Sequence, residues 1–153
     1  MRSPPPSCDR THQTPRPPPC RRTTLLRRHP PRAAHDGDMD TVLADHAEDI
    51  VMFDVPPPEN GARGIAEYRE TWPPFFTWQQ MGASFDIVEL EVTSGADVAF
   101  AHALLRCGMP EELRDAPDDR LRLTIGLRKE DGRWVVAHEH HSFTDKTCLE
   151  EAR

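Results

Sequence analysis

The stretch that decides the fold lies near the C-terminal end, where residues 131–142 read DGRWVVAHEHHS. Asp131-Gly132 is typical of a two-residue β-hairpin turn, in which both central residues take a positive φ. The dipeptide separates two runs rich in alternating or β-branched apolar residues, 120–130 and 133–143. These runs predict two long antiparallel strands joined by a tight turn.

Two further long strands are predicted upstream of this hairpin. They span residues 84–93 and 97–107, and the turn signal Ser-Gly-Ala at 94–96 separates them. Residues 108–119 contain two prolines and a cluster of acidic side chains, which we interpret as an exposed hairpin loop. The C-terminal half of the chain is therefore predicted to be an antiparallel meander.

The segment before this meander contains both helix and strand signals. Residues 39–47 show helical spacing of apolar side chains, and either Asp38 or Asp40 can cap the free N–H groups at the start. The apolar run 50–55 predicts the first strand, and Pro56–Pro58 ends it. An amphipathic helix is predicted from about residue 65, with a break or kink at Pro73-Pro74.

Charge and proline content divide the 153 residues into two parts. Residues 1–35 contain eight Arg, one Asp and nine of the 16 prolines, a net charge of +7, whereas residues 36–153 contain 11 Lys and Arg against 25 Asp and Glu, a net charge of −14. We expect a disordered tail at 1–35, one folded domain at 36–143 and a short tail at 144–153. The first tail is either an interaction segment or the product of a start placed too early.

Composition also limits the partners and the compartment. An acidic domain repels phosphate backbones, so we expect no nucleic-acid binding and favour a small organic molecule or another protein chain. The four cysteines form no C-x-x-C pair, and no long apolar run predicts a membrane span, which favours the cytoplasm. No nucleotide-binding loop, haem motif or flavin fingerprint is present, so we expect no cofactor.

Three strings of residues resemble one known family. Residues 44–53 (ADHAEDIVMF) are similar to the entry into the first strand of SnoaL-like domains, 64–69 with Trp72 to their second helix, and 131–142 to their closing strand. This family belongs to the nuclear-transport-factor-2-like (NTF2-like) superfamily, with ketosteroid-isomerase-like proteins and kinase association domains. The resemblance implies an α+β, cone-shaped NTF2-like fold in which a curved antiparallel sheet and helices enclose a pocket. The family normally begins with a long lid helix, whereas prolines interrupt residues 23–34 here.

The resemblance also implies which side chains face the pocket. On the last strand it assigns one alternating set to the pocket, namely Val135, Ala137, Glu139, His141 and Phe143. The other set is assigned to a homodimer interface through the sheet face: Trp134, Val136, His138, His140 and Ser142. On the neighbouring strand the inward set is Val98, Phe100, His102, Leu104 and Arg106.

A carboxylate beside two imidazoles is suited to acid–base chemistry, and the catalytic candidates are His102, Glu139, His141 and Asp54. A neighbouring imidazolium compensates the burial of a carboxylate and is expected to move both pKa values toward neutrality. The resemblance implies proton transfer of isomerase, cyclase or hydratase type on a small apolar or polyketide-like molecule. The candidate ligand-binding side chains are aromatic: Tyr68, Trp72, Phe76 and Phe100.

Structural interpretations of the same residues stay open. The histidines and Glu139 can form a polar network that only stabilises the domain, Asp54 can hydrogen-bond the turn that follows it, and aromatic side chains at helical spacing are commonly core. A metal at His138, His140 and His141 is disfavoured, because His141 points away from the other two. The alternative function is a non-catalytic ligand-sensing or dimerisation module.

Overall fold

The computed structural model describes residues 38–145, which contain four helices and six strands. In chain order these are α3 (Met39–Leu43), β1 (His46–Phe53), β2 (Ala62–Arg63), α4 (Gly64–Glu70), α5 (Trp72–Gln80), β3 (Ser84–Ser94), β4 (Val98–Gly108), α6 (Pro110–Asp115), β5 (Leu121–Glu130) and β6 (Arg133–Ser142). The tail at 1–35, the lid helix and most of the C-terminal tail lie outside the described residues, so those predictions stay predictions. Among residues 38–145, no helix is both long and apolar enough to cross a lipid bilayer.

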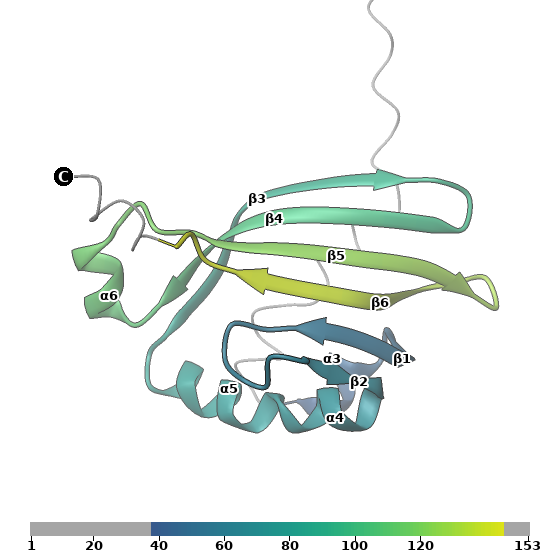
Figure 1. Ribbon diagram of the computed structural model, residues 1–153, viewed down its shortest axis with the longest axis horizontal. Coiled ribbons are helices and arrows are strands. Elements are labelled where there is room, and N and C mark those ends of the chain that lie inside the picture. The colour runs from purple at the N-terminus through teal and green to yellow at the C-terminus, as the bar shows by residue number, and fades with distance from the viewer. Residues whose placement is uncertain (1–37, 146–153) are drawn as a thin grey trace, which may run out of the picture.

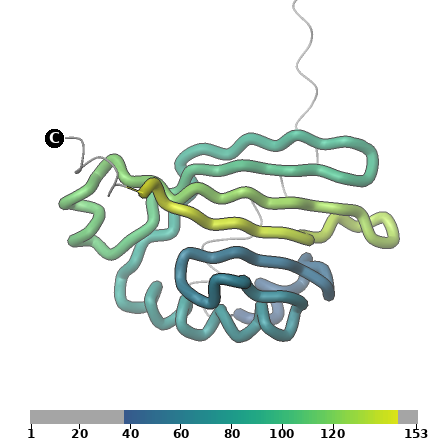
Figure 2. The backbone as a smooth tube through the Cα atoms, in the orientation of Figure 1, coloured from purple at the N-terminus to yellow at the C-terminus, as the bar shows by residue number. Residues whose placement is uncertain are grey.

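The six strands form one sheet in the order β2-β1-β6-β5-β4-β3 (Figure 1). Strands β3 to β6 form the predicted antiparallel meander, whereas β1 pairs in parallel with β6 and antiparallel with β2. Helices α4 and α5 lie beside β1 and β2 at one edge of the curved sheet, and β3 and β4 form the other edge (Figure 2). The predicted α+β, NTF2-like fold class is confirmed.

Several element boundaries differ from the sequence-based expectation, and β2 was not expected. The helix expected at 39–47 ends at Leu43, and His46 instead begins β1. The expected loop at 108–119 contains α6, in which Pro110 occupies the first turn and the Glu112 carboxylate accepts the N–H of Met109 at 2.7 Å. That N-terminal carboxylate and the proline at the first helical position explain why a short helix forms there.

Strand β4 turns its small side chains toward the core, which reverses the expected inward set. Its buried residues are Ala99, Ala101, Ala103 and Leu105. Directly paired residues of antiparallel strands share a face, and Ala101 pairs with the buried Ile125 of β5. Val98 and Phe100 therefore lie on the opposite face, where they are 67% and 49% exposed. The prediction that Val98, Phe100, His102, Leu104 and Arg106 point inward is wrong.

A bulge in β6 changes which of its side chains face the core. Leu127 of β5 pairs with Val136, but the preceding Gly126 pairs with His138, so Ala137 is an extra residue on β6. Val136 and Glu139 consequently share the core face although they are three residues apart. A strict period of two places Glu139 and His141 correctly on this face and is wrong for Val136, which is 2% exposed.

The loop after β1 imposes a severe limit on Gly61, and this gives a first prediction. Gly61 has φ +69°, and a Cβ added there would lie 2.1 Å from the Met52 carbonyl oxygen, whereas Gly82, with φ +99°, has no atom within 4 Å of such a Cβ. Both Gly→Ala changes strain the backbone, but only Gly61→Ala adds a backbone clash. We expect Gly61→Ala to lower the free energy of unfolding by about 3 kcal/mol or more.

Urea unfolding of the full chain measures this difference, with Gly82→Ala as the matched control. The control carries the positive-φ strain alone, about 1 to 2 kcal/mol. Equal losses in the two variants would show that the contact with Met52 does not restrict position 61.

Candidate functional site

Four ionisable side chains lie one after another in space on the core face of β1 and β6. We call them the polar row: His46, Glu139, His141 and Asp54. His46 Nε2 lies 3.7 Å from Glu139 Oε1, and His141 Nδ1 lies 3.3 Å from Asp54 Oδ1. The exposed fraction of the side chain rises from 1% at His46 to 34% at Asp54. The polar row thus has a buried inner end and an accessible outer end.

Tyr68 of α4 completes the inner end. Its hydroxyl lies 3.0 Å from Glu139 Oε2 and 3.0 Å from His46 Nε2, and the residue is 1% exposed. An ionised carboxylate only accepts hydrogen bonds, so the single hydroxyl proton is donated to Glu139, and His46 Nε2 donates to the Tyr68 oxygen. Burial and the Glu139 charge raise the pKa of Tyr68 well above its usual value, so it stays a neutral donor.

Glu139 is ionised despite its burial. Burial alone would raise its pKa, but His46, the positive charge of His141 and the Tyr68 hydrogen bond together lower the pKa to about 2. The expectation that this carboxyl titrates near neutrality is therefore wrong. A carboxylate this acidic is a weak base at pH 7, so Glu139 acts as a fixed negative charge.

The outer end is an ion pair between His141 and Asp54. Burial would lower the pKa of His141, but Asp54 and Glu139 raise it above the usual value of 6.5. For the acid Asp54 the signs are opposite. Burial alone would raise its pKa, but His141 and the N–H of Val55, 2.7 Å from Asp54 Oδ1, lower it below the usual value. Asp54 therefore fits both the structural and the functional interpretation, because it accepts a hydrogen bond from the following turn and also pairs with the His141 imidazole.

Aromatic side chains connect the two ends of the polar row, and we call this set the aromatic arc: Tyr68, Trp72, Phe75 and Phe85. Ring centroids are 5.9 Å apart for Tyr68 and Trp72, 5.5 Å for Trp72 and Phe75, and 5.1 Å for Phe75 and Phe85. Phe85 in turn lies 6.3 Å from the His141 ring. The arc supplies apolar surface next to a charged pair.

Two of the aromatic candidates differ in their surroundings. The indole Nε1 of Trp72 is buried, and the indole is close enough to the Tyr68 hydroxyl to act against the rise in its pKa. Phe76 contacts Trp72 but is packed with Val42 of α3 in a small separate core cluster. Trp72 therefore adjoins Tyr68 of the site, whereas Phe76 packs against α3.

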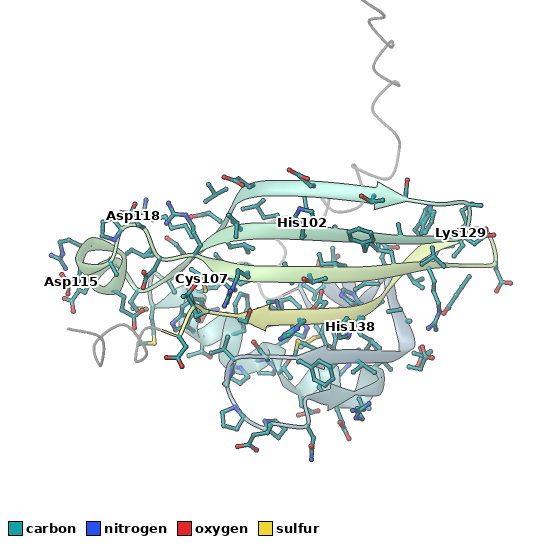
Figure 3. All side chains as sticks on the ribbon, turned by 45° about the horizontal axis from the view of Figure 1, so that its top comes forward. His102, Cys107, Asp115, Asp118, Lys129 and His138 are labelled. Atoms are coloured by element: carbon teal, nitrogen blue, oxygen red, sulfur yellow. The ribbon has the colours of Figure 1, made fainter. Side chains whose placement is uncertain are left out.

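His102 and Phe100 do not join this site. His102 Nε2 lies 3.4 Å from Glu91 Oε2, its side chain is 57% exposed, and its ring stacks on Phe100. Figure 3 shows His102 on β4 and His138 on β6, two strands apart in the sheet. The prediction that His102 meets Glu139 and His141 is wrong, because β4 directs its alanines to the core.

Two side chains near the site were not predicted to have a role there. His46 was assigned to the preceding helix, and the register of β1 shifts between His46 and Val51, so no simple period identifies its face. Cys107, near the α6 end of β4 (Figure 3), has a thiol whose pKa burial and the charges of Asp54 and Glu112 raise to about 11. This thiol is a poor nucleophile at neutral pH.

Comparison with known proteins identifies the domain. A family model described as a SnoaL-like domain matches residues 31–146. The chain belongs to the SnoaL-like family. Within residues 38–145 of this SnoaL-like protein, no three His, Cys, Asp or Glu side chains are arranged to hold a metal ion.

Solved structures with similar folds include three from bacteria. An NTF2-like protein of unknown function from Pseudomonas putida KT2440 is 31% identical, with a TM-score of 0.65 over 79% of this chain and 82% of that one. A putative ketosteroid isomerase from Shewanella frigidimarina NCIMB 400 is 19% identical, with a TM-score of 0.62 over 78% and 92%. An NTF2-like protein with a cystatin-like fold from Novosphingobium aromaticivorans is 17% identical, with a TM-score of 0.62 over 84% and 83%. The last two show the fold alone, and no curated protein matches the chain.

The lowered pKa of Glu139 predicts an acid-dependent loss of stability. A carboxyl whose pKa falls from 4.5 in the unfolded chain to about 2 in the folded one stabilises the fold above pH 4.5 and loses that contribution as the pH falls to 2. The shift corresponds to about 3 kcal/mol. We expect Glu139→Gln to weaken the pH dependence of unfolding in this window by that amount.

Urea unfolding between pH 2 and 5 checks this expectation. The matched control is Glu89→Gln, because Glu89 is exposed on β3. If both variants keep the wild-type slope, Glu139 does not carry the acid-labile stability.

Proposed function

We propose that this SnoaL-like domain binds a small, uncharged organic molecule and transfers a proton on it, in a reaction of isomerase, cyclase or hydratase type. The observation that carries the proposal is the His141–Asp54 ion pair. It combines a protonated imidazole with a carboxylate at the accessible end of the polar row, next to the aromatic arc. A titratable imidazole paired with a carboxylate beside apolar surface is an arrangement suited to proton transfer on a bound molecule.

His141 is the residue to which we assign the proton transfer. Its raised pKa favours the protonated imidazole, which can donate to an oxygen that gains negative charge in the reaction. After donation the neutral ring is a base that can take a proton back. Asp54 lies 3.3 Å from Nδ1 and stabilises the charged ring, and Glu139 contributes a second negative charge without exchanging a proton.

The surroundings favour an apolar and uncharged substrate. Trp72, Phe75 and Phe85 offer aromatic surface, and each Å² of apolar ligand surface removed from water contributes about 25 cal/mol. The polar row contains two carboxylates, and residues 36–153 carry a net charge of −14. An anionic ligand would therefore be repelled both locally and at long range.

The thermal stability of the full chain, with and without candidate ligands, tests binding. We expect neutral aromatic and polyketide-like compounds to raise Tm by several degrees at about 100 times their Kd, and matched carboxylates to have a much smaller effect. With a compound that is turned over, His141→Asn should lower kcat by about 100-fold or more. His140→Asn is the matched control, because the neighbouring imidazole is exposed on the other sheet face.

The proposal fails if His141→Asn and His140→Asn turn over a substrate equally fast. It fails as well if no neutral compound shifts Tm while the protein melts cooperatively.

The pH profile gives a separate prediction. A reaction that needs protonated His141 proceeds below the raised pKa of this group and is lost as the pH rises through it, at a midpoint above 6.5. Asp54→Asn removes a carboxylate that raises this pKa, so the midpoint of the descending limb should move to lower pH. An unchanged midpoint in Asp54→Asn would exclude His141 as the titrating group.

We also propose that the domain forms a homodimer through the sheet face opposite the polar row. Val98, Phe100 and His102 are exposed on this face, and a second copy would bury their apolar surface. This surface favours the second candidate function, a non-catalytic dimerisation or ligand-sensing module. In that module the polar row would only stabilise the fold, and His141→Asn would leave every ligand response unchanged.

A further inference from the structure

We propose that His46 is a positioning residue for His141, acting through the Tyr68 hydroxyl and the Glu139 carboxylate. The inference deepens the proposed function, because the catalytic consequence depends on the role assigned to His141. The effect of His46 on the titration of His141 does not depend on catalysis. It concerns how a buried imidazole at the start of β1 controls the charge next to another imidazole on β6.

The first step is the direction of one proton. Tyr68 has a single hydroxyl hydrogen and two partners at 3.0 Å, His46 Nε2 and Glu139 Oε2. When His46 Nε2 carries a hydrogen, it donates to the Tyr68 oxygen and leaves the phenol proton for Glu139. The tilted contact of the His46 and Tyr68 rings, with centroids 4.8 Å apart, holds the two groups in this arrangement.

The backbone fixes the position of His46. Its Cα pairs with that of Val136 on the parallel neighbour β6, and the Val136 N–H donates to the Asp45 carbonyl at 2.8 Å. The side chain is only 1% exposed. An imidazole held in this way has little freedom to release the Tyr68 hydroxyl.

The second step is the charge on Glu139. A carboxylate buried with no donors would take up a proton, because burial disfavours the charged form. The nearby His46 ring, the charge of His141 and the Tyr68 hydroxyl instead keep it ionised at neutral pH, as its pKa of about 2 indicates. Loss of His46 removes one of these groups, so the pKa of Glu139 should rise.

The third step is the effect of Glu139 on His141. The two residues are separated by one position on β6 and share the core face, so their side chains are neighbours along the strand. The other groups that face His141 are the Asp54 carboxylate, the Phe85 ring of β3 and Leu123 of β5, which is paired with His141. The negative charge of Asp54 also helps to raise the pKa of the Cys107 thiol, so this thiol stays neutral. Asp54 and Glu139 are thus the two negative charges that keep His141 protonated.

A purely structural role for His46 makes a different prediction. If His46 only fills space, its replacement changes stability and leaves the titration of His141 where it was. If His46 is a positioning residue, its replacement moves the titration midpoint of a side chain that it does not contact. The two roles are therefore separated by an NMR titration that needs neither ligand nor turnover.

The experiment follows the Cε1–H resonance of His141 against pH in the full chain. We expect Glu139→Gln to lower its midpoint by about one pH unit. His46→Ala should also lower it, but by less, because Tyr68 and His141 still favour the ionised form of Glu139. In His46→Gln the side-chain amide N–H can still donate toward Tyr68, so the midpoint should stay within a few tenths of the wild-type value. His140→Asn, on the opposite face, is the control and should leave it unchanged.

An unchanged His141 midpoint in a folded His46→Ala variant would overturn the inference, and so would a shift of equal size in His46→Gln. If His46→Ala does not fold, Tyr68→Phe makes the same test, because it removes the hydroxyl that links the two groups. The expected result there is again a lowered midpoint, and an unchanged one overturns the proposal. Failure of the proposed function is recognised separately, as an unaltered kcat in His141→Asn.

Discussion

The buried carboxylate of Glu139 is the constraint on which the rest of this domain depends. It lies on the core face of β6, a strand with neighbours on both sides, where an ionised group is stable only with donors and positive charge around it. Tyr68 of α4 and His46 of β1 meet that requirement. The network therefore ties a helix and two strands together at one point, and it explains why a phenol rather than a phenyl ring is present at position 68.

The shape of the sheet makes space for this network. The bulge at Ala137 allows Val136 to remain in the core while Glu139 and His141 also face inward, which a regular strand would not permit. On β4 the inward residues next to β5 are mainly alanines, so the sheet surface there is shallow. Large side chains of β4 that were expected to point inward, such as Phe100, lie on the opposite face. The alanines of β4 and the extra residue of β6 thus both help to make space for the polar network.

Local patterns in the sequence predicted most of the fold but only part of the site. The Asp-Gly turn at 131–132 and the apolar runs around it were sufficient for the meander, and both turn residues have a positive φ. Glu139, His141 and Asp54 were also recognised as candidates. His102 was misplaced because the inward face of β4 depends on its register with β5, which is a tertiary property. His46 was missed because an irregular strand start hides its face, and neither residue type nor spacing indicates a bulge.

The polar row divides stability and chemistry between its two ends. At the inner end every interaction favours a fixed charge, so Glu139 titrates far below neutrality and stabilises the fold. At the outer end the same charge acts on His141, whose pKa moves upward instead. Neighbouring groups whose pKa values are pushed apart are typical of sites in which one member exchanges protons and the other does not. Because the charge that stabilises the core is also the charge that keeps His141 protonated, the packing of α4 against β1 bears directly on the group to which we assign the chemistry.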